Sequence, residues 1–260
     1  MTASDVPPPV PLVDLTDEEL AALDGPPVGL VVSPYLEELE PAARDVAVVT
    51  AFRSLVARGL VLAPTPEQAT AAARAAATAG EELAAVDVEM AEVLSQVLTL
   101  RRVADRVVCV QRTTDGARAW RYLHRVDDEL TLDELVEPTG LHRYALVATP
   151  ALLDVLVDWV VPEGVDGPDG AEVALDASAA ADGRAGDALL ERLAGAHVLA
   201  DVTVRGRADA GPGRLLGTFA SPDGLHLSTT AFGTGGQVRL RPVSRRTLRA
   251  ALADQLEETS

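Results

Sequence analysis

The sequence predicts an α+β fold made of two similar halves, each an antiparallel sheet followed by a helix. The first observation is that residues 106–160 show four extended runs and then a helical run. The second is that the same order returns between residue 198 and the C-terminal region. The spacing from Arg106 to Thr149 also resembles that from Val198 to Ser244. We therefore predict a duplicated β-meander with pseudo-twofold-related halves and additional flanking helices, although two unrelated meanders would give the same pattern.

In the first unit, strands are predicted at residues 106–112, 118–126, 129–136 and 142–148. The first connection contains Asp115-Gly116, and glycine supplies the positive φ that tight hairpins need. Pro138-Thr139-Gly140 marks the third turn, and Thr149 is the predicted N-cap of a helix over residues 151–160.

The second unit has predicted strands at residues 198–205, 214–220, 225–231 and 237–241. Glycine-containing connections separate them, and Ser244 is the predicted N-cap of the closing helix. A Gly-, Pro- and Asp-rich segment separates the units. We predict an N-terminal half at residues 1–161, a linker at 162–170 and a C-terminal half at 171–260, packed as one compact unit.

Upstream of the first unit, residues 6–11 form a Pro-rich extended leader, and Thr16 with Glu19 forms a capping box for a short helix. A strand is expected at residues 28–32. Helices are expected at residues 44–58, 66–79 and 81–100, and a further one at 187–193. In the helix over residues 44–58, the apolar side chains are expected to share one face: Val46, Val49, Phe52, Leu55 and Val56.

Charge and composition exclude several classes of protein. The net charge of −18 repels phosphate backbones, so non-specific nucleic-acid binding is not expected. No apolar run reaches the roughly 20 residues of a membrane span. Cys109 is the single cysteine, which excludes an internal disulfide and fits a cytoplasmic location. The absence of Lys, Asn and Ile indicates a GC-rich bacterial source, and salt adaptation is an alternative reason for the acidity.

The sequence contains no motif with the spacing of a catalytic, cofactor or metal site. His124 and His226 alternate with leucines on strands and are expected to face solvent, whereas His142 and His197 border turns or strand starts. Cys109 lies among valines and is expected to be an inert core thiol. We therefore expect no enzyme activity, cofactor or bound metal. Packing is the simpler role for three aromatic side chains, with a partner anchor as the alternative for the first two: Trp120, Tyr122 and Trp159.

Four segments carry a resemblance to the EspG family of type VII (ESX) secretion in actinobacteria: residues 15–20, 51–62, 90–98 with 106–110, and the C-terminal "VRLRPVSRRTLRAALADQL". The resemblance implies two pseudo-twofold-related αβ halves and a cytosolic chaperone. Such chaperones bind the apolar helical tip of PPE proteins in PE–PPE pairs and keep them soluble for export. No motif transfers the contact residues of the family to this chain.

The leading hypothesis is thus a non-enzymatic chaperone or adaptor that binds a helical secreted protein, PE/PPE-like or another ESX client, with a homodimer as a further possibility. Candidate contacts are the predicted hairpin tip and a basic helix face: Thr113, Asp115, Arg118, Arg245 and Arg249. The alternative is a winged-helix nucleic-acid-binding regulator that uses residues 44–62, which begin with Arg44 and end with Leu62. A third possibility is an enzyme whose residues, such as His124 and a distant acid, come together only in the fold.

Overall fold

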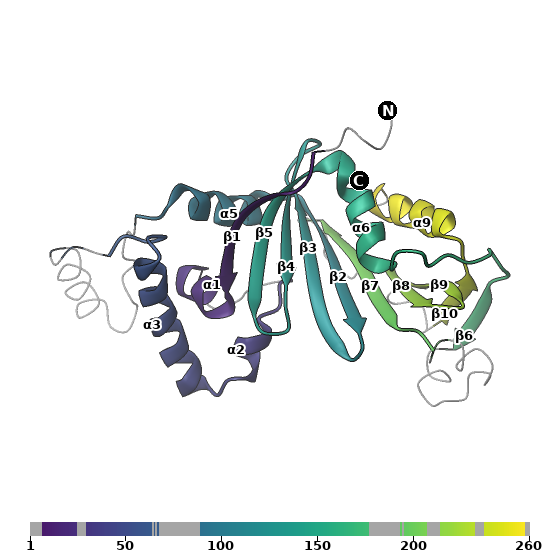
Figure 1. Cartoon of the computed structure of the whole chain (residues 1–260), viewed down its shortest axis with the longest axis horizontal. Helices are drawn as coiled ribbons and strands as arrows, with labels where there is room; N and C mark the ends of the chain where they lie inside the picture. The colour runs from purple at the N-terminus through teal and green to yellow at the C-terminus, as the bar shows by residue number, and fades with distance from the viewer. Residues whose placement is uncertain are drawn as a thin grey trace.

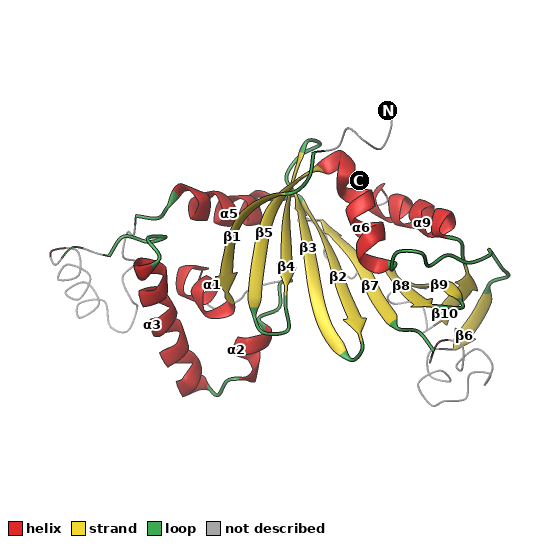
Figure 2. Ribbon diagram, viewed as in Figure 1, coloured by secondary structure: helices red, strands yellow, loops and turns green. Residues whose placement is uncertain are grey.

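One antiparallel sheet of ten strands extends across the molecule in the computed structural model (Figures 1 and 2). The structure describes residues 7–24, 30–63, 65, 67, 89–176, 193, 195–206, 214–231 and 237–257. The strand order is β1-β5-β4-β3-β2-β7-β8-β9-β10-β6. Two meanders therefore run outward from a central pair, and each receives one further strand at its outer edge.

The first meander occupies one side of this sheet. It consists of β2 (Arg106–Thr114), β3 (Ala117–Arg125), β4 (Leu130–Val136) and β5 (Leu141–Ala148), with β1 (Val10–Thr16) at the edge. Asp115 and Gly116 both have positive φ, 51° and 81°, as a two-residue hairpin turn of the type I′ class requires. The predicted Asp-Gly hairpin is therefore confirmed.

The second meander occupies the other side. It consists of β7 (Val198–Gly206), β8 (Arg214–Ser221), β9 (Gly224–Ala231) and β10 (Gln237–Pro242), with β6 (Val173–Asp176) at the edge. The antiparallel pairing of β2 with β7 joins the meanders and sets Val110 opposite Val202. The α+β class with antiparallel sheets and flanking helices is confirmed. Strand order does not measure a symmetry axis, so the pseudo-twofold relation and the boundaries at residues 161 and 171 stay predictions.

The helices form two groups that cover opposite faces of the sheet. The groups are α1 (Asp17–Asp24), α3 (Pro41–Ala57) and α5 (Glu92–Val103) on one side, and α6 (Leu152–Val160) and α9 (Arg245–Glu257) on the other. Leu132 belongs to the core under the first group and Leu123 to the core under the second. Because Leu132 is paired with His124, the neighbour of Leu123, strand alternation puts the two leucines on opposite faces.

Local signals explain most of these boundaries. The capping box is confirmed, since Thr16 Oγ1 accepts the Glu19 N–H at 3.3 Å and Glu19 Oε2 accepts the Thr16 N–H at 3.2 Å. Ser244 is also confirmed as a cap, because its Oγ accepts the Thr247 N–H at 3.2 Å. Thr149 is not the cap that we predicted. A 3₁₀ turn, η1 (Thr149–Ala151), precedes α6, and the Thr149 hydroxyl bonds to the Asp127 carbonyl oxygen at 3.1 Å.

Three predictions for the N-terminal region differ from the structure, and two predicted helices fall largely outside the described residues. The second half of the Pro-rich leader is part of β1, because Val10 and Pro11 pair with β5 at the sheet edge, where a missing N–H is tolerated. Within the expected strand 28–32, residues 30–32 are irregular and lead into α2 (Pro34–Glu38). Within the expected helix 81–100, residues 89–91 are not helical, because Met90 forms a β-bridge with Val61, and the helix begins at Glu92. Nearly all of the expected helices 66–79 and 187–193 lies outside the described residues.

Candidate functional site

The most exposed large apolar side chains of the described helices are Val46 and Val49 on α3, each 66% exposed. The two valines are three residues apart, so they lie next to each other on one helix face. Soluble proteins leave single apolar side chains exposed routinely, but neighbouring ones on a helix form the type of face that binds a partner. We call Val46, Val49 and the adjacent exposed Ala42 and Ala43 the α3 stripe.

The α3 stripe shows that the predicted single apolar face of this helix is wrong. Ala51 and Leu55 are buried, and Leu55 belongs to the core formed with α1 and α5, whereas Val46 and Val49 lie on the exposed side of the helix. The helical period already separates Val46 from Leu55, because nine residues make about two and a half turns and put the two side chains on opposite sides of α3.

Charged residues around the stripe are mainly acidic. Glu38, Glu40 and Asp45 are exposed at and before the start of α3. Arg44 is turned back toward α2, because its Nε donates a hydrogen bond to the Leu36 carbonyl oxygen at 3.0 Å. The surface therefore combines an apolar centre with more acidic than basic neighbours, since Arg53, four residues after Val49, is also exposed on this face.

The basic residues needed by the winged-helix alternative are mostly engaged within the fold. Arg58 Nη1 pairs with Glu19 Oε2 at 2.6 Å, and its Nη2 donates to the Asp14 carbonyl oxygen at 2.7 Å. With Arg44 also bound to backbone oxygen, Arg53 is the arginine of α3 left to contact phosphate. One such residue among many acids is a poor nucleic-acid surface.

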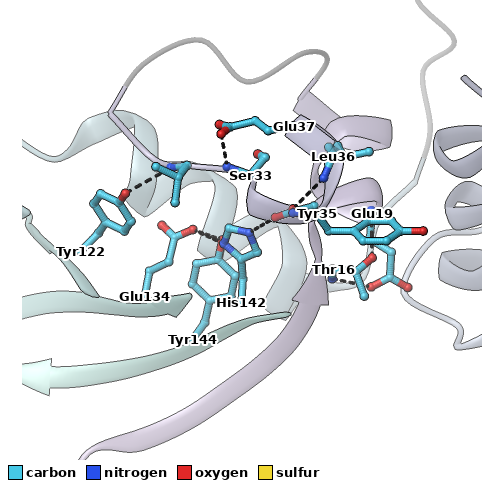
Figure 3. Close-up of polar contacts among 12 residues, drawn as sticks. Thr16, Glu19, Ser33, Tyr35, Leu36, Glu37, Tyr122, Glu134, His142 and Tyr144 are labelled. Carbon is cyan, nitrogen blue, oxygen red and sulfur yellow. Dashed lines mark hydrogen bonds and ion pairs between the residues drawn. The ribbon is translucent and has the colours of Figure 1, made fainter. Parts of the chain in front are cut away.

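Two side chains hold the segment that leads into α3: Asp17 of α1 and Tyr122 of the sheet. Asp17 Oδ2 accepts hydrogen bonds from the Tyr35 N–H at 2.7 Å and the Leu36 N–H at 3.2 Å, at the start of α2. The Val32 N–H donates to the hydroxyl oxygen of Tyr122 on β3 at 3.1 Å (Figure 3). The two bonds to Asp17 satisfy N–H groups in the first turn of α2, which have no acceptor within the helix.

Behind Asp17 lies a buried set of ionisable groups centred on Glu134 of β4. Its carboxylate accepts hydrogen bonds from four side chains at 2.7 to 3.1 Å. They come from α5, β3 and β5: Arg101 Nε, His124 Nε2, His142 Nδ1 and the Tyr144 hydroxyl. We call Asp17, Arg101, His124, Glu134, His142 and Tyr144 the polar cluster.

His142 connects the two carboxylates of the cluster. Its Nδ1 lies 2.8 Å from Glu134 Oε1, and its Nε2 lies 2.6 Å from Asp17 Oδ1 (Figure 3). A carboxylate oxygen only accepts hydrogen bonds, so both ring nitrogens must carry a proton. The imidazolium and the Arg101 guanidinium then balance the charges of Asp17 and Glu134. His124 has a different role, because its Nδ1 is buried without a partner, which fits a neutral ring that donates only through Nε2.

The environment shifts two pKa values in the directions that this charge balance requires. Burial alone would raise the pKa of Glu134, but the Arg101 guanidinium and hydrogen bonds from His124 and His142 hold it well below the usual value. Burial alone would lower the pKa of His142, but the hydrogen bonds to Asp17 and Glu134 raise it. Glu134 is therefore ionised near neutral pH, and the raised pKa of His142 favours its charged form.

Gly140 brings the β4–β5 turn against this cluster. Its carbonyl oxygen accepts the Asp17 N–H at 2.9 Å, and its φ is +78°. A Cβ atom here would lie 2.7 Å from both Asp17 Oδ2 and Tyr35 Cβ. The glycine that we predicted for the turn is thus also required by the close approach of Asp17 and Tyr35.

The polar cluster corrects our expectation that His124 faces solvent. His124 is 3% exposed and His142 is fully buried. Strand alternation correctly separated His124 from Leu123, but the opposite face is covered as well, by the first helix group. A signal was present, since Tyr122, Glu134 and Tyr144 stand in register on adjacent strands. That register could not be read from the sequence before the strand pairing was known.

The candidate contact residues lie on separate elements. Asp115 and Arg118 are exposed at the β2–β3 tip, and Thr113 is partly buried beside it. On α9, Arg245 Nη2 bonds to Asp158 Oδ1 at 2.7 Å and Arg249 pairs with Asp154, both on α6. These two arginines already hold α9 to α6, so their predicted contact with a client would have to compete with these ion pairs.

Cys109 is partly buried, and burial raises the pKa of its thiol to about 11, which disfavours the reactive thiolate at neutral pH. Within the described ranges, no three His, Cys, Asp or Glu side chains are arranged to hold a metal ion. No helix in the described part of the chain is both long and apolar enough to cross a membrane.

Comparison of the sequence with models of known protein families and with curated proteins finds no match in either. The EspG resemblance therefore stays a prediction.

Proposed function

We propose that this protein is a non-enzymatic adaptor or chaperone that binds an apolar helix of a client protein through the α3 stripe. The observation that carries the proposal is the 66% exposure of Val46 and Val49 on a helix whose other end is packed in the core. The polar cluster supports this role because its Asp17 binds the first turn of α2, and α2 directly precedes the helix that carries the stripe.

The energetics of such a contact are sufficient for reversible binding. Burying one exposed valine side chain is worth about 1.5–3 kcal/mol before the costs of association. Two valines and the neighbouring alanines would supply the apolar centre of a modest interface. Helices recognise each other through residues spaced by three and four positions, which is the spacing of the stripe.

The border of the stripe selects the charge of the client. Because the exposed acids Glu38, Glu40 and Asp45 near the stripe outnumber the exposed Arg53, a client helix with Lys or Arg beside its apolar residues is favoured over an acidic one. The EspG resemblance suggests that this client is a PPE-like or other type VII secretion substrate, kept soluble in the cytoplasm before export.

A binding experiment with paired variants tests the proposal. Val46→Ser with Val49→Ser should reduce capture of a co-encoded helical secretion substrate at least about tenfold, because the apolar contact is lost. Val173→Ser, which changes another exposed valine on β6, is the matched control and should bind normally. Unchanged capture by the double variant, or no helical substrate that binds the wild-type protein, would overturn the proposal.

A further inference from the structure

Arg112 of β2 is a partly buried cation for which the described residues provide no acidic partner. Its Nε atom is buried without a hydrogen-bond acceptor. Its guanidinium lies 5.1 Å from the ring centre of Trp159 on α6. In a chain with net charge −18, an arginine at such a position without a carboxylate is unexpected.

Trp159 contributes a second unused donor at the same place. Its indole Nε1 is buried and has no acceptor. Unpaired buried N–H groups are costly and infrequent, so two of them on side chains in contact indicate a missing acceptor. The Arg112 guanidinium also offers its Nη donors, and Nε with one Nη forms the paired geometry that fits two oxygen atoms.

The neighbouring arginine defines the charge of the missing group. Arg121 of β3 lies 5.3 Å from the same indole ring centre, but Asp133 already neutralises it through bonds of 2.8 and 2.5 Å. One uncompensated positive charge remains, and it matches a singly charged carboxylate better than a phosphate dianion.

We propose that Arg112 and Trp159 form a binding site for one carboxylate group, whose oxygens accept hydrogen bonds from Arg112 Nε and Trp159 Nε1. The site lies on the face of the sheet covered by α6, opposite the polar cluster, and does not depend on the α3 stripe. The carboxylate belongs either to a small organic acid or to an acidic side chain of another polypeptide.

Side-chain NMR on the ¹⁵N-labelled full chain tests this site. Sodium acetate should shift the Trp159 indole and Arg112 Nε–H signals together and saturably, whereas acetamide, a neutral analogue, should not. The Trp120 indole is an internal control, because it already donates to Gln111 Oε1 at 3.3 Å. A glutamate-rich peptide distinguishes the sources: binding much tighter than acetate indicates a polypeptide, and equal binding indicates a small acid.

Two variants complete the test. Arg112→Gln should weaken acetate binding at least about tenfold, because a charged hydrogen-bond pair is lost. Arg143→Gln, which changes an exposed arginine on β5, should leave it unchanged. If Arg112→Gln does not fold, weaker acetate binding by Trp159→Phe and the absence of a shift with acetamide still test the site. No saturable shift, equal shifts with acetamide, or undiminished binding by Arg112→Gln would overturn the proposal, as would a bound water as the only occupant.

Discussion

The two helix groups are attached to the same sheet in different ways. The helices α6 and α9 lie on an aliphatic core, and their ion pairs, Arg245 with Asp158 and Arg249 with Asp154, are at the solvent border. The first group also has an apolar core, but buried ionised groups of the polar cluster connect α1 and α5 to the strands.

Both kinds of contact stabilise the attachment of helices to the sheet, but they differ in how closely they fix the position of the helices. Aliphatic packing tolerates small adjustments, whereas a charge that is buried needs its partners at fixed positions. The polar cluster therefore determines where the α1–α2 region sits, and it also makes this region sensitive to pH. The α6–α9 side should lack that sensitivity.

The largest loss of stability is expected for Glu134→Ala. The change leaves the Arg101 and His142 charges buried without their common carboxylate, which should lower the free energy of unfolding by about 3–5 kcal/mol. Urea denaturation followed by circular dichroism measures this value. A loss below about 1 kcal/mol would mean that the cluster does not hold the fold.

On the opposite face, Leu156→Ala removes a fully buried side chain of α6. The lost burial and the cavity should cost about 2–5 kcal/mol. Unlike the effect of Glu134→Ala, this cost should be the same at pH 5 and pH 9, because the side chain contacts an aliphatic core. A strong pH dependence of the Leu156→Ala effect would contradict the claim that only the face with the polar cluster is sensitive to pH.

The free energy of unfolding of the wild-type protein should fall at both high and low pH, in an alkaline and an acidic limb. The folded-state pKa of His142 is raised above 6.5, so its stabilising contribution is complete below that pH and is lost as the pH rises through the folded-state pKa. The pKa of Glu134 is depressed below 4.5, so its contribution is complete above that pH and is lost as the pH falls through the folded-state pKa.

Each limb should have a slope of at most about 1.4 kcal/mol per pH unit for one proton. His142→Gln should lower stability overall and flatten the alkaline limb, while the acidic limb remains. Denaturation series at several pH values provide the measurement. An alkaline limb that persists unchanged in His142→Gln would assign it to another group.

The smallest effect is expected at the solvent border of the second group. Arg249→Gln removes the pair with Asp154, in which both side chains are about half exposed. Such pairs contribute about 0–1 kcal/mol, and salt screens them. A thermal melt should therefore move by only a few degrees, and a larger shift would show that this pair matters more than its exposure suggests.

Local chemistry made the strands, turns and two caps predictable. Asp115-Gly116, Thr16 with Glu19, and Ser244 each act within a few residues, so the sequence carries the whole signal. The edge strand β1 was missed because Pro11 weakens a strand signal and its pairing with β5 is distant in the sequence.

The candidate site was less predictable because it depends on contacts between distant segments. Asp17 and His142 are 125 residues apart, and their contact needs both the strand register and the packing of α1. The helical period puts Val46 and Leu55 on opposite sides of α3, but only the fold shows that the side with Leu55 packs on α1 and α5.

The central claim is that an imidazolium bridges two buried carboxylates and thereby seats the α1–α2 region. Long-range ¹H–¹⁵N NMR spectra of the histidine rings at pH 7 test it directly. We expect both nitrogens of His142 to be protonated and His124 to be a neutral Nε2–H tautomer. A neutral His142 ring at that pH would contradict it.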